Sequence, residues 1–302
     1  WQNCKQLKHK YMKKLFITLA AAAIAMLAAN AEEKEKVYDF GEITSINAGF
    51  SYEINVTHGR SDKVKVVYDS EMENLLEIKY SSTTKSLSLF VKNDIQKMFK
   101  NKSRNATRVQ VYLEMKDIKS IDLSGAAKAT FEGTFKTDNL DMDLSGAAGV
   151  NALQINGMTL DADCSGAASA FITGDFTEKM EVDISGAAKM ELNSNSAELD
   201  ADISGASKFI CDGSFNKCEV ACTGASSATI KGKAGNAEYE CSGASSIDAE
   251  DFIVRNVDLE LTGASKAKVH ATSELRHNVS RASKMTYYGN AKLVNLSNDS
   301  NI

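Results

Sequence analysis

Acidic side chains recur at one slot of a repeated pattern, three positions before a glycine. The five aspartates in this slot are Asp122, Asp143, Asp163, Asp183 and Asp202. If the repeats are stacked strands, neighbouring carboxylates lie about 4.8 Å apart and repel by ~0.9 kcal/mol in bulk water. Calcium could neutralise them through roughly six to eight oxygen ligands, but the glycine-rich nonapeptide of calcium-binding β-rolls is absent.

Lysines at a second slot, three positions after the same glycine, offer a simpler way to offset this charge. They are Lys128, Lys189, Lys208, Lys266 and Lys284. Each lysine follows the bend that the aspartates precede, and backbone N–H groups of the turn can also donate to the carboxylates. We therefore expect a structural charge ladder, with no metal and no other cofactor.

The residues that could support catalysis are few. A polysaccharide lyase would need an acidic metal cluster beside a basic residue that removes a proton. Arg255, Arg276 and Arg281 fall at loops or near the C-terminus, away from the aspartate ladder, and no HExxH, GxSxG or Cys-His arrangement is present. We expect no enzyme, with a carbohydrate-active, pectin-lyase-like enzyme as the alternative.

Three phenylalanines form the candidate binding row. Phe135, Phe176 and Phe215 stand ten positions after alternate glycines, so stacked repeats would space their rings by about 9.6 Å. Aromatic faces at such intervals could stack on sugar rings. The same slot has the inward parity of the apolar positions, so burial under a loop is the competing interpretation.

Cysteines occupy two kinds of position. Cys164, Cys222 and Cys241 take a slot otherwise filled by leucine or isoleucine, which indicates buried apolar packing. Cys211 and Cys218 flank one loop and are positioned to form a disulfide in an oxidising compartment. No zinc-type cysteine spacing occurs.

These residues belong to a repeat of about twenty residues. The central glycines are Gly125, Gly146, Gly166, Gly186, Gly205, Gly224, Gly243 and Gly263, with Arg281 in a ninth slot. Apolar residues alternate on both sides of each glycine, which predicts two strands joined by a tight bend that needs a positive φ. Single strand pairs cannot bury their apolar faces, so the units must stack. The sequence predicts an all-β, two-sheet parallel β-solenoid of about nine rungs, roughly 43 Å long.

The region before the repeats differs in both composition and pattern. A basic start at Met12, an apolar run and the Ala29-Asn30-Ala31 site predict a signal peptide, so residues 1–31 would be an upstream remnant plus the signal. Residues 32–118 alternate as strands and predict a β cap, and residues 119–302 form the solenoid. No other segment is apolar enough to span a membrane.

The net charge of the chain limits the classes of partner that it can bind. After residue 31 the chain has 30 basic against 40 acidic residues and contains only six arginines. Neutralising phosphates needs clustered Lys and Arg, so we expect no nucleic-acid binding. Proline is absent, which suits uninterrupted β pairing.

The motifs together resemble a known family. The opening FGEITSINAGFSYEINVTHG, the strands KVKVVY, LEIKY and LSLFVKND, and the recurring SGA turns are similar to the auto-transporter adhesins with a head GIN domain, common in Bacteroidetes; SGA here replaces the GSG often seen there. The resemblance implies a two-sheet β-superhelix without known catalytic residues, a role in adhesion and a trimeric assembly.

The sequence therefore predicts a non-catalytic, exported adhesin of the periplasm or cell surface, with a glycan or a surface protein as its partner. A purely structural envelope protein is a further alternative. Glycan retention of the purified chain would separate these readings.

Overall fold

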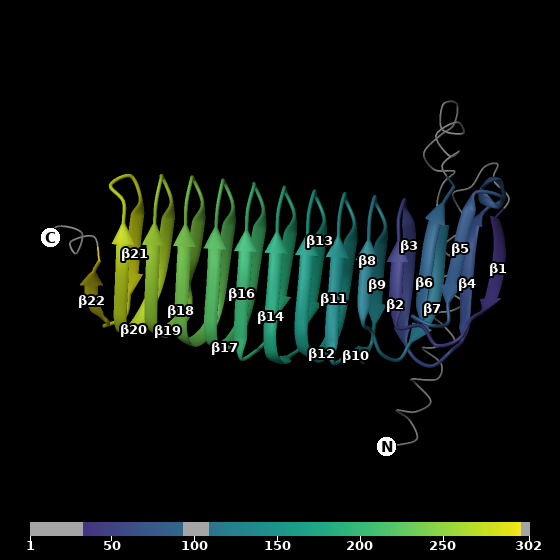
Figure 1. Ribbon diagram of the computed structural model, residues 1–302, viewed down its shortest axis with the longest axis horizontal. Helices are drawn as coiled ribbons and strands as arrows, with labels where there is room; N and C mark the ends of the chain where they lie inside the picture. Colours follow the sequence, from purple (N-terminus) through teal and green to yellow (C-terminus); the bar gives the residue numbers. More distant parts are fainter. Residues whose placement is uncertain (1–32, 93–108, 297–302) are drawn as a thin grey trace, which may run out of the picture.

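The computed structural model describes residues 33–92 and 109–296, which fold into a straight β-solenoid. Strands lie side by side along a rod, with the N-terminal region at one end and the last strand at the other (Figure 1). Strand pairing along the repeats is parallel and in register. The predicted all-β parallel solenoid of about nine rungs is confirmed.

Two stacks of strands run the length of the rod, and longer strands contribute to both. The first stack contains the strands that precede each bend, and we call it the acidic sheet. Its members are β5 (Leu76–Ser81), β6 (Ser86–Val91), β2 (Ser45–Ala48), β8 (Ser120–Leu123), β11 (Asn139–Leu144), β14 (Phe176–Ile184), β16 (Glu198–Ile203), β22 (Lys292–Asn295) and the second halves of β12 (Gly149–Cys164), β17 (Lys208–Cys222), β18 (Ser227–Cys241), β19 (Ser246–Leu261) and β20 (Lys266–Val279).

The second stack contains the strands that follow each bend, and we call it the opposite sheet. Its members are β1 (Glu33–Asp39), β4 (Lys63–Asp69), β7 (Val109–Met115), β3 (Tyr52–His58), β9 (Lys128–Glu132), β13 (Ser169–Thr173), β15 (Lys189–Asn193), β21 (Lys284–Tyr288) and the first halves of β12 and β17 to β20. Short β10 (Thr134–Lys136) and the 3-10 turn η2 (Ser70–Met72) complete the elements.

The glycine bends form a stacked corner. All eight central glycines have φ between 69° and 77°, a region that side chains with a Cβ disfavour. The following alanine N–H donates to the glycine carbonyl of the previous rung, for example Ala206 to Gly186 at 2.7 Å. At the last corner Arg281 does not have a positive φ. There the hydroxyl of Ser283 donates to the Gly263 carbonyl at 3.1 Å.

The same corner continues into the N-terminal region, which the sequence did not indicate. Phe50 has φ 63° and accepts the Ala126 N–H at 2.5 Å. β2 and β3 flank this corner and pair in parallel with β8 and β9. The predicted boundary at residues 118/119 therefore lies within continuous sheets, and it stays a prediction.

One hydrophobic core fills the rod from end to end, made of the alternate inward residues. Two bulges change the predicted inward set. Ala152 has φ 56° and is exposed, and Leu153 takes the inward slot opposite Ile172. Ile253 is likewise 50% exposed while Phe252 is buried, because β19 carries extra residues relative to both neighbours. A β-bulge shifts side-chain parity, which a fixed-spacing pattern misses.

No helix among the described residues is long and apolar enough to cross a bilayer. The predicted signal peptide lies outside the described residues.

Candidate functional site

The most extensive polar feature is a flat field of carboxylates on the outside of the acidic sheet. The predicted ladder is in register, from Asp122 through Asp143, Asp163 and Asp183 to Asp202. A second acidic row, which the sequence reasoning missed, lies two positions earlier in each strand. It consists of Asp141, Asp161, Glu181, Asp200, Glu219, Glu238 and Asp258. We call the two rows together the acidic face.

Side chains alternate between the two faces of a strand, so residues two positions apart lie on the same face, and the second row could have been found from the residues at that slot. The negative charge of the second row is partly offset by lysines. Lys179 contacts Glu181 at 2.9 Å and Asp200 at 3.4 Å, and Lys217 contacts Glu219 at 2.5 Å. The first row has no such relief: within the described part of the chain, no lysine or arginine nitrogen lies within 4.0 Å of its five aspartates.

The expectation that the lysine ladder offsets the aspartate ladder is therefore wrong. The two ladders sit on different sheets, on either side of the corner, so their side chains diverge. Lys189, for instance, contacts Glu191 of its own strand at 3.6 Å. The first row of the acidic face therefore keeps its negative charge uncompensated by these lysines.

Crowding changes how these carboxylates titrate. Burial, followed by repulsion from neighbouring acidic residues, raises the pKa of Asp122, Asp163 and Asp183. The same two causes raise the pKa of Glu238. No group of three or more His, Cys, Asp or Glu side chains in the described ranges is arranged to hold a metal ion. A row of parallel carboxylates is suited to contact with a broad cationic surface.

We predict that Asp163→Asn increases the free energy of unfolding at pH 7 by about 0.5 kcal/mol, because it relieves repulsion between exposed charges. A carboxyl whose folded-state pKa is raised binds protons more readily in the native state, so its destabilising charge disappears as pH falls. The gain should therefore vanish below about pH 3.5, where the wild-type carboxyl is also neutral. Urea unfolding at both pH values measures it.

The comparison variant Glu42→Gln should have the opposite sign at pH 7. A hydrogen bond from Lys85 lowers the pKa of Glu42, so its charged form favours folding. A loss of stability in Asp163→Asn at pH 7 would contradict the account of the acidic face.

The candidate binding row of phenylalanines is not on the surface. Phe135, Phe176 and Phe215 are 0%, 1% and 6% exposed. The slot keeps inward parity, and the rings pack beneath the loops: Phe135 meets Phe131 edge-on at 5.7 Å. The stacking role predicted for them is wrong for the folded chain, and the competing interpretation, burial, is what the structure has.

The five cysteines among the described residues are all core residues. Cys164, Cys222 and Cys241 are buried in the inward slot, as predicted. Cys211 and Cys218 are also fully buried, and both are free thiols in the structure, so the disulfide that their positions suggested is not formed. Burial raises the pKa of both thiols, which keeps them protonated and weakly nucleophilic.

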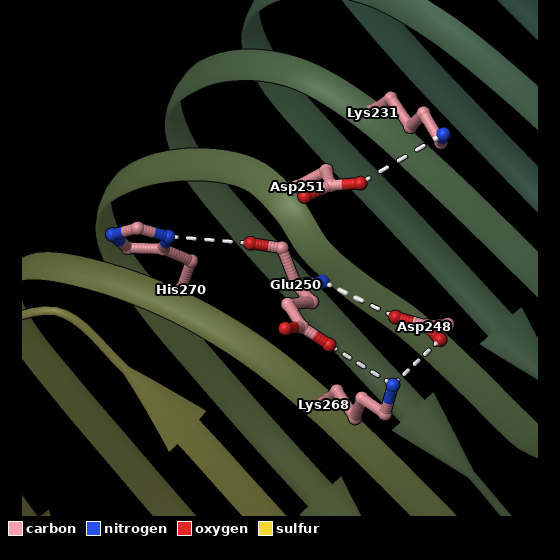
Figure 2. Close-up of polar contacts among 6 residues, drawn as sticks. All are labelled: Lys231, Asp248, Glu250, Asp251, Lys268 and His270. Carbon is pink, nitrogen blue, oxygen red and sulfur yellow. Dashed lines mark hydrogen bonds and ion pairs between the residues drawn. The ribbon is translucent and has the colours of Figure 1, made fainter.

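A second charged group lies on the opposite sheet, at the bulge of β19. Figure 2 shows its six residues: Lys231, Asp248, Glu250, Asp251, Lys268 and His270. Lys268 of the next rung bridges Asp248 at 3.1 Å and Glu250 at 3.0 Å. The Glu250 carbonyl also lies 3.2 Å from His270 Nδ1. The lysines and carboxylates of this group pair with one another across rungs. They therefore stabilise the bulge of β19 and leave little uncompensated charge.

The other two described histidines do not come together with other catalytic residue types. His58 packs edge-on against Phe135 at 5.4 Å, and His277 continues an inward column next to Leu259. A cavity of about 320 Å³ at the N-terminal end is lined by residues of both charge signs, including Glu42, Arg60 and Glu114. None of the described residues that line it is a histidine or a cysteine.

The chain matches a known sequence family over most of its length. The profile described as "Putative auto-transporter adhesin, head GIN domain" matches residues 42–192 and 177–291. The chain belongs to this family. The resemblance based on the opening strands and SGA turns is therefore confirmed.

Two solved structures to which this head GIN protein is similar have titles that name them as putative adhesins. A "putative adhesin" from Parabacteroides merdae is 17% identical, with a TM-score of 0.50, over 89% of this chain and 98% of that one. A "putative adhesin" from Parabacteroides distasonis is 18% identical, with a TM-score of 0.45, over 88% and 95%. At 17% identity the likeness to the Parabacteroides merdae protein concerns the fold alone. No curated protein matches the chain.

Proposed function

We propose that this head GIN protein is a non-catalytic, exported adhesin that uses its acidic face to bind a basic protein at the cell surface. The observation that carries the proposal is the first row of aspartates, which stacks in register and has no lysine or arginine within 4.0 Å in the described ranges. Mutual repulsion between these aspartates lowers the stability of the fold. A partner that supplies cations would remove this repulsion, which favours binding.

The shape of the rod supports the same conclusion. A solenoid presents equivalent side chains at a fixed interval of about 4.8 Å, so a partner meets many carboxylates at once. Each exposed contact is weak by itself. Several contacts held on one rigid surface give useful affinity and a high rate of encounter.

The experiment measures retention of the purified chain on two immobilised sets, basic proteins and a panel of glycans, as the salt concentration rises. We expect retention on basic proteins that falls steeply with salt, because exposed charges are screened. The triple variant Asp143→Asn/Asp163→Asn/Asp183→Asn should weaken it at least tenfold.

The matched control removes three carboxylates elsewhere on the rod. Glu132→Gln/Asp138→Asn/Asp212→Asn changes the net charge equally and alters exposed residues outside the acidic face. We expect less than a twofold effect. Equal losses in both triple variants would reduce the proposal to a net-charge effect. Retention on a glycan that survives high salt would instead favour a sugar partner, and no retention on either set would favour a structural envelope role.

A further inference from the structure

The two ends of the rod are built differently. At the N-terminal end antiparallel strands close both sheets, β1 on β4 and β5 on β6. The β1 edge also carries alternating charges, with Lys65 contacting Glu35 at 2.9 Å, a common protection against further pairing. At the other end β21 and β22 each pair with β20 alone in the described part of the chain. We call β21, β22 and the Arg281 turn the terminal rung (Figure 1).

At the terminal rung the columns of stacked core side chains end without a covering strand. Tyr287 stacks on Val269 and Leu293 on Leu275, and both of these partners are fully buried. Tyr287 and Leu293 themselves are each 42% exposed. One more strand laid on β21 would cover Tyr287, and one laid on β22 would cover Leu293, as each internal rung covers the one before it. Either strand would supply partners for the open backbone groups of its edge.

Charge at this end is opposite to that of the rod. Residues 274–296 contain four lysines and arginines and one acidic residue, Glu274. Lys284 stacks directly on Lys266, and within the described ranges no carboxylate oxygen lies within 4.0 Å of either amine or of Arg281. Two like charges on neighbouring strands are destabilising.

Three cations of the rod contact carboxylates of an adjacent rung. Lys268 contacts Asp248 at 3.1 Å, Lys179 contacts Asp200 at 3.4 Å, and Arg276 contacts Asp258 at 3.4 Å. A strand added beyond β21 would complete this pattern if it carried a carboxylate beside Lys284. We propose that the terminal rung binds an extended peptide of a partner protein, in which acidic and apolar residues alternate, as one further strand of the rod.

This peptide site is separate from the acidic face, so the two proposals can fail independently. The probe is a fluorescent synthetic peptide with the sequence of residues 196–205, SAELDADISG, which alternates acidic and apolar residues. Fluorescence anisotropy with the full chain should show saturable binding. A peptide with its three acidic residues changed to lysine should bind at least tenfold more weakly.

The variant Arg281→Glu/Lys284→Glu should weaken binding of the acidic peptide at least tenfold. The matched control is Lys128→Glu/Lys208→Glu, which alters the same outward positions as Lys284 in internal rungs and should leave binding within twofold. Urea unfolding verifies that both variants fold. A third variant, Tyr287→Asn, tests the apolar contact without a change of charge and should weaken binding severalfold.

Absence of saturable binding, or equal binding to the two double variants, would overturn the proposal. Binding that appears only after removal of residues 297–302 would also overturn it, because the chain's own tail would then be the occupant.

Discussion

Replacement of Phe176 by alanine is expected to lower the free energy of unfolding by about 3–5 kcal/mol, the usual cost of removing a buried aromatic ring. The ring is 1% exposed, and it lies so close to Gly157 that a Cβ there would approach it to 3.1 Å. Little space exists for the neighbours to relax into the cavity. Urea unfolding followed by circular dichroism measures the change.

The same rung supplies the control. Phe171 is 39% exposed, so Phe171→Ala should change the free energy of unfolding by less than about 1 kcal/mol. Partner binding should be retained by Phe176→Ala under conditions where it remains folded. Lost binding with unchanged stability would mean that the ring faces a ligand after all.

Gly205→Ala is expected to lower the free energy of unfolding by about 2–4 kcal/mol. Gly205 has φ +72°, and a Cβ placed on it would lie 2.5 Å from the carbonyl oxygen of Gly186. That oxygen already accepts the N–H of Ala206 at 2.7 Å, so the two rungs cannot move apart without loss of the hydrogen bond. The shift of the urea midpoint is the readout.

Gly149→Ala is the appropriate comparison. Gly149 has no positive φ, and the nearest atom to an added Cβ is the Ser169 hydroxyl at 3.5 Å, an ordinary contact. The midpoint should stay nearly unchanged. Similar shifts for the two variants would mean that loss of glycine as such, and not the corner geometry, determines the effect.

The repeat made most of the fold predictable. A glycine every twenty residues with alternating apolar slots on both sides fixes the bend, the strands and the inward set. Leu123, Ile184 and Met190 are buried as the period requires. The family resemblance rested on the same residues and was confirmed.

The sequence-based predictions were wrong where the twenty-residue repeat is interrupted, or where residue spacing alone does not determine which side chains come into contact. Bulges at Ala152 and in β19 shift which residue points inward, and only the backbone reveals them. Phe50 replaces glycine at an early corner, so the repeat could not be followed into the N-terminal region. The lysine ladder has the right spacing to offset the aspartates, but the corner directs it to another sheet.

The stacking direction also determines how the rod would bear load. Hydrogen bonds between rungs run along the long axis, so a pull on the last strand peels one edge at a time and does not shear many bonds together. Each rung of about twenty residues that unfolds would release roughly 65–70 Å of extended chain. A molecule attached by its C-terminal end would therefore lengthen in steps and absorb mechanical work while its N-terminal rungs stayed folded.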